Sequence, residues 1–116
     1  MSSALLDSEG SITESFESVL KHIFLKYATP STPQHLESAV LFPENLDKWA
    51  TDTNGQPFTQ ETKDELLEFM DCDQRGCLTW KGFLQVYQLQ TENDEEETWR
   101  DLARHGFDRS LKLSGS

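Results

Sequence analysis

The sequence predicts an all-α domain built from two paired helix-loop-helix units. A short β-bridge is expected between the two loops, and an additional C-terminal helix is expected to pack in the groove of the pair. Two observations carry this prediction: five segments repeat apolar residues at helical spacing, and one loop has a regular pattern of acids, glycine and an apolar residue. The 116 residues are the size of a single domain.

The chain is expected to begin with a disordered tail. Residues 1–12 are rich in serine and acidic residues and lack periodicity. From Thr13 onward, apolar residues recur at spacings of three and four, which predicts a first amphipathic helix. Its apolar face consists of Phe16, Val19, Leu20, Ile23, Phe24 and Tyr27.

Prolines separate the first helix from the second. Pro30 and Pro33 end the first helix, because each removes an amide donor and restricts the residue before it. Pro43 stands near a helix start, where its missing amide costs nothing. We therefore expect a second helix over 43–51.

Three further helices are predicted in the C-terminal half. Thr59 is a capping residue ahead of apolar positions, which predicts a third helix over 60–70. The loop 71–79 separates this helix from a fourth, and a polar hinge over 91–94 separates the fourth from a fifth that ends at His105-Gly106. The apolar residues of these last two helices are Phe83, Leu84, Val86, Tyr87, Leu89, Trp99, Leu102 and Ala103.

The segment 71–82 has the frame of a calcium-binding EF-hand loop. Asp71 and Asp73 stand at positions one and three, Gly76 at position six, and the apolar Leu78 at position eight. Glycine at position six permits the sharp turn, and the eighth residue can pair with a sister loop as a short strand.

The ligand set of this loop is incomplete. Arg75 stands at position five, where a cation cannot coordinate, and Gly82 replaces the glutamate that normally supplies two oxygens at position twelve. The remaining ligands fall short of the roughly six to eight oxygens that calcium takes. They are Asp71, Asp73, the carbonyl of Cys77 and Thr79. The sequence therefore predicts a structural loop without a cofactor, or at most one weak calcium site. A calcium sensor that completes its shell with water and backbone is the alternative hypothesis.

EF-hands occur in pairs, so a sister loop is expected earlier in the chain. Aligning Tyr27 with Met70 places that loop over 28–45, which is longer than the standard twelve residues. Its nominal ligand positions hold Ala28, Pro30 and Thr32, so no cation site is expected there. Leu41 is expected to pair with Leu78.

In this register, residues 13–90 resemble the EF-hand superfamily as a degenerate pair. The chain is also similar to plant EF-hand proteins with tetratricopeptide repeats and, more closely, to the Miro mitochondrial GTPases, through the segments 77–84 and 97–108. The latter resemblance implies that a C-terminal segment over 91–116 folds back as a ligand mimic into a groove lined by the first, third and fourth helices. Its implied anchors are Trp99, Leu102 and Phe107. The sequence has no GxxxxGKS motif, GTPase domain or membrane span, all of which the Miro proteins have.

Composition limits the classes of partner. Ten Lys and Arg against 21 Asp and Glu give a formal charge of −11, which repels nucleic acids and anionic lipid surfaces. No apolar stretch approaches the roughly 18 to 20 residues that would insert across a membrane. Cys72 and Cys77 lie in one loop, and the start of the chain lacks the features of a signal peptide, so a cytoplasmic location is expected.

Catalytic and zinc chemistry find no support in the sequence. There is no glycine-flanked nucleophile, no Cys and His pair can be assigned, and Cys72 and Cys77 lack CxxC spacing. The acidic run 92–97 is interpreted as complementing a helix dipole, with docking of a basic partner as the second interpretation. The end of the sequence, 113–116, resembles a truncation, so the chain is also considered as one domain of a longer protein.

The leading hypothesis is therefore a non-enzymatic, monomeric protein-interaction or adaptor domain. Its groove would bind a protein or a helical peptide, and the acidic charge favours a basic one. The expected groove residues are Phe24, Phe69, Met70, Phe83 and Tyr87.

Overall fold

The computed structural model describes residues 4–29 and 33–113. Their elements, in chain order, are α1 (Glu14–Leu25), the 3-10 helix η1 (Pro33–Ser38), β1 (Val40–Leu41), α2 (Pro43–Asn54), α3 (Gln60–Phe69), β2 (Leu78–Thr79), α4 (Trp80–Asn93) and α5 (Glu95–Arg104). The described part of the chain is thus mostly helical with one small sheet, as the predicted class requires. Pro30 and Thr32, two nominal ligand positions of the first loop, lie outside the described residues. No helix in the described ranges has the length and apolar character needed to cross a bilayer.

Four of the helices start directly after a residue whose side chain caps the helix. Thr13, Thr59, Thr79 and Asp94 each accept a hydrogen bond from the backbone N–H three residues later, at the starts of α1, α3, α4 and α5. Helix α2 begins instead with Pro43 at its first position. Local chemistry therefore explains why the predicted and observed helix starts agree so closely.

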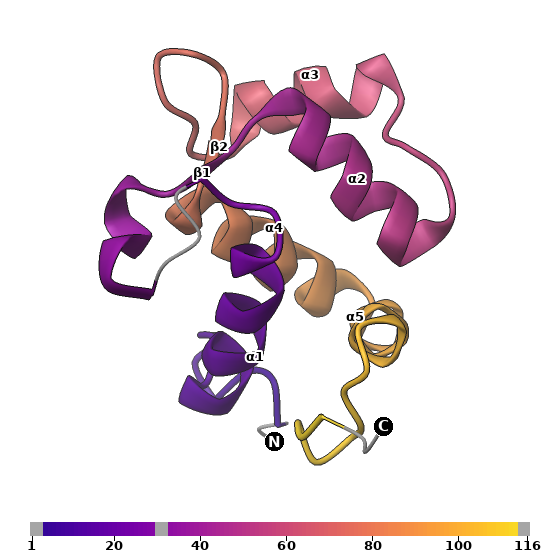
Figure 1. Ribbon diagram of the computed structural model, residues 1–116. Coiled ribbons are helices and arrows are strands. Elements are labelled where there is room, and N and C mark those ends of the chain that lie inside the picture. Colours follow the sequence, from indigo (N-terminus) through magenta and orange to yellow (C-terminus); the bar gives the residue numbers. More distant parts are fainter. Residues whose placement is uncertain (1–3, 30–32, 114–116) are drawn as a thin grey trace.

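Two short strands join the loops that precede α2 and α4. They pair antiparallel, with Leu41 opposite Leu78 and Val40 opposite Thr79. In Figure 1 the pair lies where the connection into α2 meets the connection into α4. The predicted pairing of Leu41 with Leu78 is confirmed in its register.

Aromatic side chains from three helices form the centre of the core. The Phe83 ring of α4 lies 5.2 Å from the ring of Phe24 in α1 and 4.8 Å from that of Trp49 in α2, measured between centroids. The same buried cluster includes Trp99, Leu102 and Phe107. Residues 91–113 therefore share one core with residues 13–90, and the predicted division at residue 90 does not separate two packing units.

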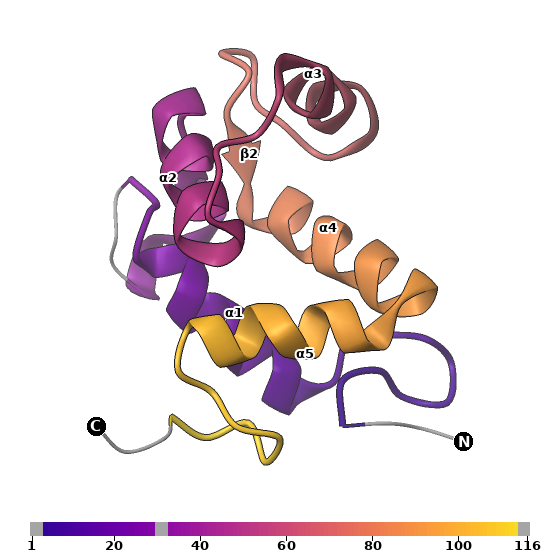
Figure 2. The ribbon, with the colours of Figure 1, turned by 90° about the vertical axis from the view of Figure 1, so that its right-hand side faces the viewer.

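Helix α5 follows α4 almost without a break. The predicted hinge over 91–94 is reduced to Asp94, because α4 continues to Asn93 and Asp94 caps both helices. Figure 2 shows α5 turning back at the end of α4, so that the two helices form a V. Helix α5 packs against α4 and α2. The predicted groove wall from the third helix is therefore replaced by the second.

The predicted disorder of residues 1–12 does not hold for the described residues 4–12. Leu5 is fully buried in the core, Leu6 forms a β-bridge with Ile12, and the Thr13 hydroxyl donates to the Ala4 carbonyl at 2.7 Å. The Asp7 carboxylate closes the turn between them by accepting backbone N–H bonds. The polar residues thus form a turn here, and the buried side chain of Leu5 holds the segment against the core. Residues 1–3 of the predicted tail lie outside the described residues.

Candidate functional site

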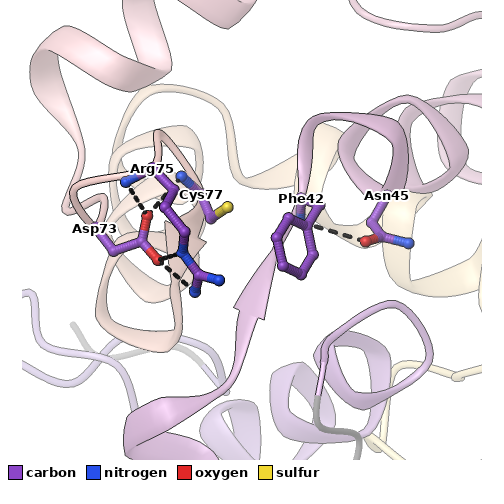
Figure 3. A network of polar contacts seen from close by, with 5 residues as sticks. All are labelled: Phe42, Asn45, Asp73, Arg75 and Cys77. Atoms are coloured by element: carbon purple, nitrogen blue, oxygen red, sulfur yellow. Dashed lines mark hydrogen bonds and ion pairs between the residues drawn. The ribbon is translucent and has the colours of Figure 1, made fainter.

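The two oxygens of the Asp73 carboxylate are occupied by donors from its own loop. Oδ1 accepts from the backbone N–H groups of Arg75 at 2.9 Å and Cys77 at 3.0 Å. Oδ2 accepts from the Arg75 side chain, at 2.9 Å from Nη2 and 3.2 Å from Nε (Figure 3). The Cys77 N–H bond, followed by the Arg75 side-chain bond, holds the pKa of Asp73 below its usual range. Asp73 is thus ionised at neutral pH, with an internal cation as its partner.

Arg75 also ties this loop to the start of α2. Its guanidinium carbon lies 5.1 Å from the centroid of the Phe42 ring, a cation–π distance. The backbone N–H of Phe42 in turn donates to Oδ1 of Asn45 at 3.3 Å, which supports the first turn of α2 (Figure 3). Arg75, which was predicted to stand at a ligand position, therefore makes a contact between the two loop regions.

The other expected ligand atoms also have partners inside the protein. The Thr79 hydroxyl is in hydrogen-bond contact with Oδ2 and the main-chain carbonyl of Asp71. The carbonyl of Cys77 accepts from the Asp73 N–H at 2.9 Å. Within the described residues, no three His, Cys, Asp or Glu side chains gather into a group that could hold a metal ion. Asp71, Asp73, Cys77 and Thr79 do lie together in one loop, and they are joined by hydrogen bonds.

Gly82 has a steric role that the sequence alone does not reveal. A Cβ atom placed on Gly82 would lie 2.2 Å from the Asp71 carbonyl oxygen and 2.6 Å from Cδ1 of Leu78. The first turn of α4 therefore approaches the loop backbone more closely than any side chain permits. The glutamate expected at position twelve of a calcium loop would not fit here without a shift of the backbone.

The predicted groove residues divide into two groups. Phe24, Phe83 and Tyr87 are buried in the core, so they do not line an open groove. Phe69 is 68% exposed, and Met70 is half-buried. The prediction that all five line one groove is wrong, because a helical repeat of apolar residues does not indicate which of them the neighbouring helices cover.

An open apolar groove does exist between the end of α3 and the outer face of α4. Its volume is about 290 Å³, and it is lined by Phe69, Met70, Gln85, Gln88, Leu89 and Glu92. Leu89 is 49% exposed. We call this surface the α3–α4 groove.

The three predicted anchors of the C-terminal segment are all buried. Leu102 is fully buried, and Trp99 and Phe107 are nearly so. The indole N–H of Trp99 donates to Oε2 of Glu95 at 2.9 Å, and the Arg109 guanidinium carbon lies 5.0 Å from the centroid of the Trp99 ring. The Phe107 ring meets the His22 ring of α1 edge-on at 5.4 Å. The contact of Phe107 with His22 attaches the C-terminal segment to α1, whereas the contacts of Trp99 with Glu95 and Arg109 lie within the segment.

His105 contacts Lys26 and Thr53, although the sequence identified it only as a helix cap. Its Nδ1 lies 3.1 Å from Nζ of Lys26, and its Nε2 lies 2.7 Å from the Thr53 hydroxyl. Because an ammonium group can only donate, Nδ1 accepts and the Nε2–H donates to Thr53. Burial, followed by the charge of Lys26, lowers the pKa of His105 to about 4. A neutral histidine thus joins α5 to α1 and α2, and no local sequence pattern marks it.

No model of a known protein family matches this chain, and no curated protein matches it. The geometry of the described residues therefore carries the functional argument.

Proposed function

We propose that this chain is a non-enzymatic protein-interaction domain that binds a basic, amphipathic segment of a partner in the α3–α4 groove. In this proposal the fold is a degenerate EF-hand pair, and the loop 71–82 has a structural role. The observation that carries the proposal is the exposure of Phe69 and Leu89 on the two sides of one groove.

Exposed apolar side chains of this size are informative when they gather. Phe24, Phe83 and Tyr87 are buried, whereas Phe69 is 68% and Leu89 is 49% exposed. Both line the groove together with the half-buried Met70. Contiguous exposed apolar surface with a polar rim is typical of protein-binding sites. An apolar face of a helical partner segment would cover these side chains.

The charge around the groove favours a basic partner. Glu92 lines the groove directly. Glu65 is exposed and precedes Phe69 by one helical turn, which places both on the same side of α3. The chain carries a formal charge of −11. Lysine or arginine residues beside the apolar face of the partner would therefore be attracted, and acidic segments repelled.

A structural role for the loop 71–82 agrees with its internal partners. The guanidinium of Arg75 neutralises Asp73, and Gly82 leaves no room for a glutamate ligand. In this proposal the domain stays in one conformation, and calcium does not control the α3–α4 groove. The free thiols of Cys72 and Cys77 are compatible with a cytoplasmic setting, which belongs to the same proposal.

The groove can be tested with a defined probe. A synthetic amphipathic helix of leucine and lysine is titrated into the ¹⁵N-labelled chain, with a leucine and glutamate peptide of the same pattern as the charge control. We expect the basic peptide to shift the amide resonances of the C-terminal end of α3 and of residues 85–92, and the acidic peptide to have little effect.

Variants separate groove binding from general attraction. The double substitution Phe69→Ser and Leu89→Ser should abolish the shifts. Leu67→Ser is the matched control, because Leu67 is 47% exposed on the same helix but does not line the groove. Equal binding of the acidic peptide, or undiminished binding to the double variant, would contradict the proposal.

Calorimetry with calcium and magnesium tests the loop separately. We expect no binding heat at micromolar calcium, because the ligand atoms of the loop bond to one another. Heat accompanied by a change in helical content would instead support the calcium-sensor hypothesis.

A further inference from the structure

Met70 supplies a thioether to the wall of the α3–α4 groove. It follows α3 directly, and its half-buried side chain lines the groove beside Phe69 and Leu89. These three side chains are the apolar part of the lining. The polar part consists of Gln85, Gln88 and Glu92. A polar group in place of the Met70 thioether would therefore remove one of the three apolar contacts that the groove offers to a partner.

A methionine at such a position can be oxidised. Peroxides convert the flexible, apolar thioether to a polar sulfoxide, and this reaction does not require the sulfur to be ionised. Accessibility to the oxidant decides which methionines react, and Met70 lines a groove that is open to solvent. The sequence contains two methionines, Met1 and Met70, and only Met70 belongs to the described residues. Oxidation of methionine within the described fold is thus confined to the groove.

The two thiols that follow Met70 are less susceptible to oxidation. The thiolate is the form of cysteine that reacts with oxidants. Burial, followed by the charges of Asp71 and Asp73, raises the pKa of the Cys72 thiol. Burial also raises the pKa of Cys77, whose side chain is 1% exposed. Both thiols are therefore protonated at neutral pH, and Met70 is the sulfur of this region that an oxidant reaches in its reactive form.

The groove can accommodate the oxygen of a sulfoxide. The backbone N–H of Asp71 donates to Oε1 of Gln85 at 2.8 Å, which determines the orientation of the side-chain amide. The Nε2 group of Gln85 is then the part of the amide that can donate to a sulfoxide oxygen. Gln85 lines the same groove as Met70. A hydrogen bond between them would keep the polar oxygen inside the groove.

We propose that Met70 is a reversible oxidation site that controls binding in the α3–α4 groove. Hydrogen peroxide transfers one oxygen atom to the sulfur: its O–O bond breaks, an S–O bond forms, the thioether is oxidised, and the peroxide is reduced to water. A methionine sulfoxide reductase reverses the reaction, in which two thiols become a disulfide and the oxygen leaves as water. The sulfoxide weakens the contact with the apolar face of a partner segment. This inference rests on the proposed function of the groove.

The leucine and lysine peptide is the probe for this control. Its dissociation constant for the full chain is measured before and after peroxide treatment, and mass spectrometry of a digest confirms that the fragment with Met70 has gained one oxygen. We expect the dissociation constant to rise about 3- to 10-fold, as when roughly half of the burial free energy of a methionine side chain is lost. Methionine sulfoxide reductases for both epimers should restore the affinity, whereas dithiothreitol, which reduces oxidised thiols, should not.

Two variants assign the effect to Met70. Met70→Leu has no sulfur at this position, so its affinity, whatever the starting value, should be the same before and after peroxide. Because Met1, Cys72 and Cys77 remain in this variant, it also controls for their oxidation. Met70→Gln places a polar side chain in the groove, so it should bind the peptide as weakly as the oxidised parent chain without any peroxide.

The outcomes separate this inference from the proposed function. An unchanged affinity after complete oxidation of Met70, an equal loss of affinity in Met70→Leu, or oxidation of Cys72 ahead of Met70 would overturn the oxidative control and leave groove binding intact. Absence of peptide binding before peroxide would overturn the proposed function, and the control of that binding with it.

Discussion

Helices α3 and α5 are both ten residues long, and both begin with a capping side chain, yet they are used differently. Helix α5 buries Thr98, Trp99, Asp101 and Leu102, whereas α3 buries only Leu66. The difference teaches that equal length and equal capping do not lead to equal burial. Helix α5 belongs to the core, and α3 keeps most of its surface for solvent or for a partner.

The two helices are also attached in different ways. Helix α3 makes an ion pair with α2, from Lys63 to Asp47 at 3.0 Å, and the Asp71 N–H just after the helix donates to Gln85 of α4 at 2.8 Å. Helix α5 is held along its length, by polar contacts such as Thr98 with Thr91 and by His105 at its end. Substitutions in α5 should therefore affect stability, and substitutions on the outer face of α3 should affect binding.

The largest effect is expected for Leu102→Ala in α5. Leu102 is fully buried, so the variant should lose about 3 kcal/mol of unfolding free energy through lost burial and a residual cavity. The matched variant Leu67→Ala in α3, at a position 47% exposed, should change stability by less than about 0.5 kcal/mol. Urea denaturation followed by circular dichroism measures both. Similar losses in the two variants would show that α3 is packed as tightly as α5.

Gly82→Ala tests the contact that holds the loop after α3 against α4. The added Cβ would overlap the Asp71 carbonyl, so we expect a loss of about 2 kcal/mol as backbone and side chains shift. Lys81→Ala is the control, since Lys81 is exposed in the same helical turn. Thermal unfolding measures the difference, and a Gly82→Ala melting curve like that of the control would refute the steric argument.

The attachment of α5 through His105 should make stability depend on pH. Because the folded-state pKa is about 4 and the usual value is 6.5, the unfolded chain binds the proton first as the pH falls. Stability from this group is complete above pH 6.5 and is lost as the pH falls toward 4. We expect a loss of about 2 kcal/mol, allowing for partial solvent exposure.

The variant His105→Gln isolates this effect from other titrating groups. Lys26, Asp52 and His22 all act on the His105 ring, and each remains in the variant. Denaturant curves at pH 7 and pH 4.5 should differ less for His105→Gln than for the parent chain. If the unfolding free energies of His105→Gln and of the parent chain depend on pH in the same way, His105 is not the group that makes stability depend on pH.

The smallest change in stability is expected for Phe69→Ser on the outer face of α3. Phe69 is 68% exposed, so unfolding free energy should stay within about 0.5 kcal/mol of the parent value. Binding of the leucine and lysine peptide should nevertheless weaken at least several-fold. A large loss of stability would mean that Phe69 supports the fold and is not free for a partner.

Several parts of the molecule follow from residues that are close together in the sequence. Thr13, Thr59 and Thr79 cap the helices that follow them, and Leu41 pairs with Leu78 as the loop alignment predicts. The candidate loop is equally local, since Asp73 and Arg75 lie two residues apart and bond within one turn. Such features were predictable because each depends on chemistry within a few positions of the chain.

Other parts depend on segments that are far apart. Leu5 belongs to a segment predicted to be disordered, but its side chain is fully buried because it packs into the hydrophobic core. Phe69 was expected to share one groove with Phe24, Phe83 and Tyr87, but it is 68% exposed while those three are buried. His105 is neutral only because Lys26 and Thr53, distant in sequence, surround its ring. A list of apolar positions does not contain this information.

By itself, then, the sequence determined the helices, their caps, the register of the short strand pair and the local bonds between Asp73 and Arg75. Only the tertiary structure decided that α5 packs on α2, that Phe69 faces outward and that His105 joins α5 to α1 and α2. The physical reason is that capping and turn formation are short-range, whereas burial depends on which surfaces meet after the whole chain has folded.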